Sequence, residues 1–175
     1  MNTGPSTWKL VLAGFVIFAL GAGAFAAYGG LASSGSPKQR MVAWVKASGL
    51  GASTGTLQTD DSNVTLVVKD HDGIGTVHEI CGVLSVDSLS ANQELPSPNP
   101  TVTNDLTNAY QLEYQAANDC YNGGVTGTAL LNRSARERRE ARVSLSNALT
   151  LVNRIIGSTV STTTTTSPDS GSIFG

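Results

Sequence analysis

An uncharged apolar stretch near the N-terminus differs from everything that follows it. Residues 10–32 are almost wholly apolar and contain no charged side chain. About 20 residues, at 1.5 Å rise per residue, are enough for a helix to cross the hydrocarbon core of a bilayer. Trp8 and Tyr28 lie near its two ends, where amphipathic rings favour the headgroup layer. The pattern predicts a transmembrane helix over residues 10–32, preceded by a short cytoplasmic head over residues 1–9.

A removable signal peptide is the alternative interpretation of the same stretch. Ala24-Phe25-Ala26 has the small-x-small pattern that a signal peptidase requires. The apolar run continues to Leu31 and is long enough for a span, which favours the retained helix. Membrane lipid would then be the partner of residues 10–32, whereas cleavage after Ala26 would release a secreted protein.

Downstream of this stretch the pattern of apolar positions changes to a helical one. Between residues 37 and 157, apolar side chains recur mostly every three or four positions, as in helices with one buried face. Ser36-Pro37 and Asn99-Pro100 are predicted helix starts, because a capping side chain followed by proline suits a helix N-terminus. The last helix is predicted from about Thr128 to Ile156. We therefore expect an all-α bundle of about four helices over residues 37–157.

The region after the first of these helices is ambiguous. Three glycines are expected to interrupt that helix: Gly49, Gly51 and Gly55. Residues 56–69 fit a helix face, although the β-branched run 64–68 also fits one strand of a hairpin. A helix is preferred because a lone hairpin would be marginally stable. Asp72 is then predicted to cap the next helix, in the turn that follows residue 69.

Charge is distributed unevenly in a chain whose net charge is only −2. Residues 60–119 contain ten acidic side chains and one basic one, whereas residues 133–154 contain six arginines and two glutamates. The arginine run 133–142 is interpreted as an exposed helix face that balances the acidic segment within the same domain. It has no interleaved aromatic side chains for stacking on bases, so no nucleic acid partner is expected.

Cys81 and Cys120 are the two cysteines of the chain. Both fall on the apolar faces of their predicted helices. The proline cluster 96–100 lies between them, and it must end the preceding helix near Gln93 and turn the chain back. The two cysteines lie at comparable distances from this turn. An exported chain with two cysteines usually joins them. The sequence therefore predicts one disulfide and a domain that lies outside the cytoplasm.

Several local sequences together resemble a known group of proteins. They are an apolar leader, Trp44 in the first helix, and the segments Ile80–Leu84, Leu95–Pro100 and Ala116–Cys120. This combination resembles uncharacterised small proteins of actinobacteria that are secreted or anchored in the membrane. The resemblance covers about residues 38–156. It implies a cell-envelope location and a helical bundle with one disulfide across a proline-rich turn, and it implies no activity.

The one group of side chains with metal-ligand chemistry surrounds two histidines. His71 and His78 lie near Asp70, Asp72 and Glu79, but their spacing matches no zinc motif. We interpret these residues as a polar turn and a solvated helix start. No catalytic, cofactor-binding or metal-binding residue is predicted, and a metal-dependent hydrolase built on the histidines is the less favoured alternative.

The favoured function is a binding or structural role in the cell envelope, and no enzymatic activity is expected. The helical domain would lie outside the cell membrane, either anchored by residues 10–32 or secreted, with a disordered Ser/Thr-rich tail over residues 158–175. An accessory subunit of a membrane protein complex is the alternative, because small residues within 10–32 allow close approach of another helix. Another envelope or membrane protein is then the expected partner.

Overall fold

The computed structural model describes residues 35–162 of the 175-residue chain. The predicted cytoplasmic head, the predicted transmembrane stretch and residues 163–175 lie outside the described residues. The chain divides into two units, residues 1–36 and 37–175, and the five helices belong to the second. No helix within residues 35–162 is both long and apolar enough to cross a membrane.

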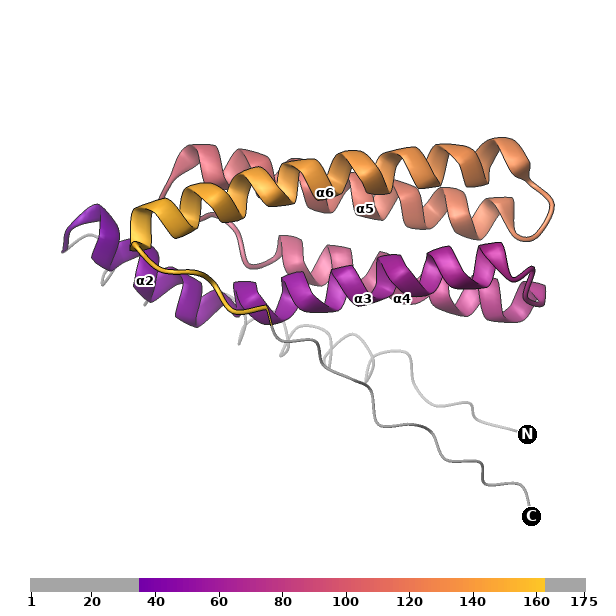
Figure 1. Ribbon diagram of the computed structural model, residues 1–175, viewed down its shortest axis with the longest axis horizontal. Helices are drawn as coiled ribbons and strands as arrows, with labels where there is room; N and C mark the ends of the chain where they lie inside the picture. Colours follow the sequence, from indigo (N-terminus) through magenta and orange to yellow (C-terminus); the bar gives the residue numbers. More distant parts are fainter. Residues whose placement is uncertain (1–34, 163–175) are drawn as a thin grey trace, which may run out of the picture. The chain divides into compact units, whose positions relative to one another are not determined.

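The described residues form five α-helices and no strand, which confirms the all-α prediction. The four longer helices run alongside one another, and the shorter one lies at one end (Figure 1). The described residues thus contain five helices where about four were expected, and the shorter one begins at Pro37 as predicted. The helices are α2 (Pro37–Ser48), α3 (Leu50–Lys69), α4 (Ile74–Asn92), α5 (Pro100–Gly123) and α6 (Thr128–Ile156).

The ambiguous segment 56–69 is helical, so the hairpin alternative is wrong. The helix also begins earlier than expected, because only Gly49 separates α2 from α3. Gly49 has φ 67°, a left-handed conformation that glycine adopts without a steric penalty. Gly51 and Gly55 lie inside α3 and do not interrupt it. At Gly51 the missing side chain leaves room for the backbone of Ser161.

The two predicted caps that flank α4 and α5 have different outcomes. Asn99 caps α5 as predicted, since its side-chain oxygen accepts from the backbone N–H groups of Thr101 and Val102 at 2.9 and 3.1 Å. The prediction for Asp72 is wrong, because α4 begins one residue later with Gly73 at the N-cap. The Asp72 N–H donates to the carbonyl of Val67 and so belongs to the end of α3.

Apolar side chains from all five helices form one continuous core. Trp44 of α2 is buried in it and donates its indole N–H to the carbonyl of Glu94 at 3.2 Å, which connects α2 to the α4–α5 loop. Beyond α6, Val160 packs against the same core, and its N–H donates to Asn153 Oδ1 at 2.7 Å. The start of the segment predicted to be disordered is therefore packed on the bundle.

Candidate functional site

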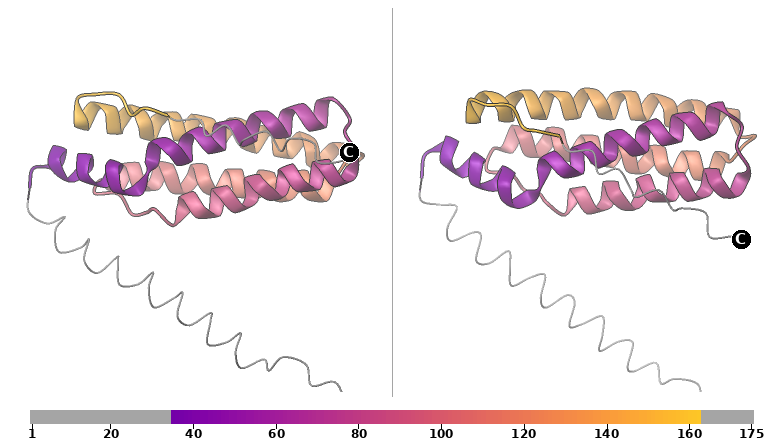
Figure 2. Two further views of the ribbon diagram at one scale, coloured as in Figure 1. Left: turned by 90° about the horizontal axis from the view of Figure 1, so that it is seen from below. Right: turned by 60° about the horizontal axis from the view of Figure 1, so that its bottom comes forward.

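A group of charged side chains, most of them buried, lies among the four long helices, whose arrangement Figure 2 shows from two further sides. Its members come from α3, α4, α5 and α6. We refer to it as the charge cluster, defined by Asp60, Asp61, Asp87, Glu113, Arg138 and Arg142.

Asp61 of α3 is the point at which α6 is attached to α3. Arg138 reaches from α6 and places Nη1 at 2.5 Å from Asp61 Oδ1 and at 2.9 Å from the Asp61 carbonyl. The same nitrogen donates to Thr65 Oγ1 at 2.8 Å. Arg142, one helical turn further along α6, pairs with the second carboxylate oxygen, Asp61 Oδ2. Two guanidinium groups of α6 therefore hold one carboxylate of α3.

The Asp61–Arg138 pair is buried on both sides. Asp61 is 5% exposed and Arg138 is 6% exposed, whereas Arg142 extends to the surface. Removing charges from water costs several kcal/mol for each ion, and charge-assisted hydrogen bonds offset this cost only when the geometry is good. Arg138 makes three such contacts through Nη1, but its Nε has no hydrogen-bond partner among the described residues.

Asp60 and Asp87 form a second part of the cluster, between α3 and α4. Burial raises the pKa of Asp60 to about 7, and the neighbouring Asp87 carboxyl group adds to the shift. Asp60 Oδ2 is buried and has no partner within the described part of the chain. This pair is therefore a site at which the protein holds a proton near neutral pH.

Glu113 of α5 is the most deeply buried carboxyl group of the cluster, at 3% exposed. Burial raises its pKa to about 8, and the negative charges of Asp61 and Asp60 add to the shift. Arg138 and Arg142 act in the opposite direction, but they do not cancel the cost of desolvation. Glu113 Oε2 makes no hydrogen bond to any described residue. Glu113 is thus a second carboxyl group that holds its proton near neutral pH.

The sequence did not predict that buried carboxyl groups would meet. The arginine run 133–142 was expected to be an exposed helix face, and this is wrong for Arg138, which is buried. The other arginine of the cluster, Arg142, is exposed. One signal was present, since Asp60, Asp61 and Glu113 occupy positions on the apolar faces of their helices.

The expectation that the basic segment pairs with the acidic segment inside the domain is confirmed. Besides the two arginines that hold Asp61, Arg133 of α6 pairs with the buried Asp119 of α5. Arg133 also lies at 3.8 Å from Glu137 on its own helix. Burial and the Asp119 charge raise the pKa of Glu137. The α5–α6 contact thus has its own ion pair, between the exposed Arg133 and the buried Asp119.

The predicted disulfide between Cys81 and Cys120 is present and connects α4 to α5. Both cysteines are fully buried, with 5.8 Å between their Cα atoms. A shallow groove of about 250 Å³ lies beside the disulfide, lined by Gly82, Ser85, Ala117, Asn118 and Tyr121. The α4–α5 contact is therefore covalent, and Gly82, Ser85 and Ala117 leave a groove beside the bridge.

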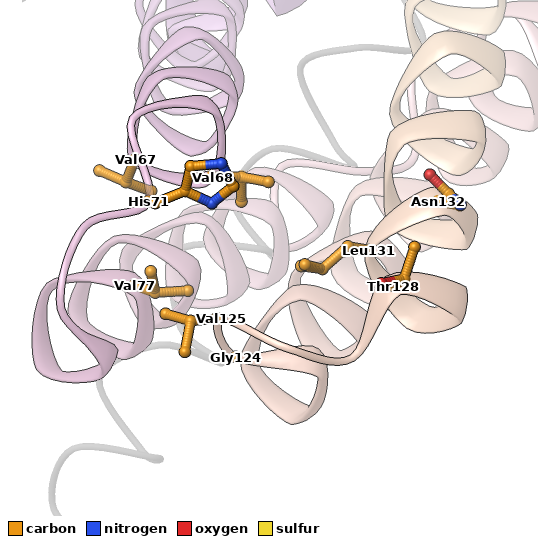
Figure 3. Close-up of a pocket in the computed structure, with 9 residues that line it drawn as sticks. All are labelled: Val67, Val68, His71, Val77, Gly124, Val125, Thr128, Leu131 and Asn132. Atoms are coloured by element: carbon orange, nitrogen blue, oxygen red, sulfur yellow. The ribbon is translucent and has the colours of Figure 1, made fainter.

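The two histidines lie in different surroundings. His71 follows α3 with φ 55° and lines a pocket of about 220 Å³, on the α3 side in Figure 3, with Thr128 and Asn132 on the α6 side. His78 stacks on Tyr121 of α5, with ring centres 4.1 Å apart. Across residues 35–162, no three potential ligands among histidine, cysteine, aspartate and glutamate are grouped to hold a metal ion.

Comparisons with known proteins found no matching family model, no matching curated protein and no matching solved structure.

Proposed function

We propose that the protein is an extracytoplasmic helical module, anchored in or secreted across the cell membrane, with a binding or structural role in the cell envelope and no enzymatic activity of its own. The observation that carries this proposal is the disulfide between Cys81 and Cys120. Reducing compartments keep cysteine thiols reduced, so a buried structural disulfide supports an oxidising location. The apolar residues 10–32 supply the means of export or anchoring.

The exposed surface of α4 and α5 supports binding to another protein. Glu79 is the one charged residue among the exposed residues of α4 and α5. Interfaces between proteins are depleted in charge and enriched in tyrosine. This surface favours the second candidate, an accessory subunit of a membrane protein complex. The large exposed apolar and aromatic side chains of the α4 and α5 surface are Ile74, Val83, Val86, Leu89, Tyr114 and Tyr121.

A reporter that is active only after export, fused after Gly157, tests the location. We expect activity from the fusion to residues 1–157 and none from a matched fusion that lacks residues 1–34. Fractionation of the cells then separates an anchored protein from a secreted one. Activity of a cytoplasmic reporter in place of the exported one would reverse the proposed topology.

Co-purification after extraction in a mild detergent tests the role as an accessory subunit. Val86→Glu on α4 and Val143→Glu on α6 form a matched pair, since these side chains are 65% and 62% exposed. We expect a stoichiometric partner that is retained by the wild type and the Val143 variant and lost from the Val86 variant. A partner that both variants retain would contradict binding through α4 and α5.

A further inference from the structure

The charge cluster contains more acid than base. Its charged groups come from every helix packed around it: Asp60 and Asp61 of α3, Asp87 of α4, Glu113 of α5, and Arg138 and Arg142 of α6. Four carboxyl groups thus face two guanidinium groups. With every group charged, the cluster would have two negative charges in excess, largely removed from water. Two bound protons would make it neutral.

Two carboxyl oxygen atoms of the cluster lack hydrogen-bond partners among the described residues. Asp60 Oδ2 and Glu113 Oε2 are buried and have no hydrogen-bond partner within residues 35–162. A buried carboxylate without partners is costly, and a protonated carboxyl group costs much less. Asp61 differs, because both of its oxygens accept from arginine side chains. The two protons that neutralise the cluster therefore belong to the Asp60–Asp87 pair and to Glu113.

We propose that the charge cluster is a pH-dependent switch, in which two bound protons keep α3 packed against α6 and their loss lets α3 separate from α6. The contact that opens is the one between α3 and α6, because it depends on Asp61 and the two arginines, whereas α3 packs more extensively against α4. By contrast, α4 and α5 are held by the disulfide. Unlike the proposed envelope function, this switch does not depend on where the protein is located.

The direction of the pH dependence follows from the raised pKa values. The pKa of Asp60 is raised to about 7 and that of Glu113 to about 8 in the folded bundle, whereas both groups titrate near 4 in water. The closed state therefore binds more protons than the open state between about pH 4 and pH 8. Opening becomes more favourable as pH rises through this window, and it stops changing once both protons have left.

Amide hydrogen exchange of the full-length protein in detergent tests the switch. Exchange is measured from pH 5 to pH 9 and corrected for the intrinsic effect of pH on the exchange rate. We expect the opening equilibrium of α3 to increase by about tenfold per pH unit for each proton released, and then to level off. Amides of α4 and α5 should change much less. Equal changes in all helices, or no change in α3, would overturn the proposal.

Neutral variants separate this switch from general loss of stability. Asn at position 60 and Gln at position 113 keep the shape of a protonated carboxyl group but cannot release a proton. In Asp60→Asn/Glu113→Gln we expect α3 to remain protected at pH 9, with a flat profile. Glu79→Gln, at an exposed acid of α4, is the matched control and should behave as the wild type. A double variant that opens with the pH dependence of the wild type would overturn the proposal.

A measurement on the wild type covers the case in which the double variant does not fold. The ¹³C shifts of side-chain carboxyl groups report protonation directly during a pH titration. We expect two protons to leave buried carboxyl groups between about pH 6 and pH 9. Carboxyl groups that are all deprotonated by pH 6 in the folded protein would exclude the switch.

Discussion

The α4–α5 and α3–α6 contacts of the bundle are made by different chemistry. Between α4 and α5 there is a buried disulfide with small side chains around it. Between α3 and α6 the attachment is a buried carboxylate held by two arginines. A disulfide and apolar packing depend little on pH, whereas a charged contact depends on the protonation of its neighbours. One side of the bundle is therefore fixed, and the other can respond to its surroundings.

The largest expected effect comes from removing the carboxylate on which the α3–α6 contact depends. Asp61→Ala leaves Arg138 buried without its partner, and breaking a buried ion pair in this way costs about 3–5 kcal/mol. Denaturation by urea should show this loss in the free energy of unfolding. Asp105→Ala, a partly exposed acid on α5, is the control and should change stability little. An Asp61 variant as stable as the control would show that the ion pair does not hold the contact.

Breaking the α4–α5 contact should have a somewhat smaller effect. The disulfide joins residues 39 positions apart, and removing such a bridge costs about 2–4 kcal/mol, chiefly by freeing the unfolded chain. Cys81→Ser and Cys120→Ser should each lower the melting temperature. A reducing agent should have the same effect on the wild type and none on the double variant. Two free thiols in the unreduced, unfolded protein would show that the bridge is absent.

The smallest expected effect is a gain in stability at the groove beside the disulfide. Gly82 lies inside α4, and nothing lies within 4 Å of a Cβ added there. Gly82→Ala should therefore stabilise the protein by about 0.5–1 kcal/mol, because alanine favours helix more than glycine does. Gly124→Ala is the contrasting control and should be destabilising, since Gly124 has a positive φ and faces Ile74. A loss of stability in the Gly82 variant would mean that the groove requires glycine.

Features that depend on local chemistry could be predicted from the amino-acid sequence alone. Asn99 followed by Pro100 marks the start of α5, because the cap needs only the backbone of the next three residues. The disulfide could be predicted, because the proline turn makes two successive helices antiparallel neighbours and the two cysteines lie at similar distances from that turn. The helical period likewise marked most of the apolar positions that became the core.

Which charged side chains meet depends on how the helices pack against one another. Asp61 and Arg138 are 77 positions apart, and no local signal connects them. A helical period shows which face a residue occupies, but not how one helix is rotated and shifted against another. Arg138 and Arg142 both fit the spacing of α6, and the packing of α6 against α3 buries the first and exposes the second. The pKa values of Asp60 and Glu113 depend on the same packing, because burial is their main cause.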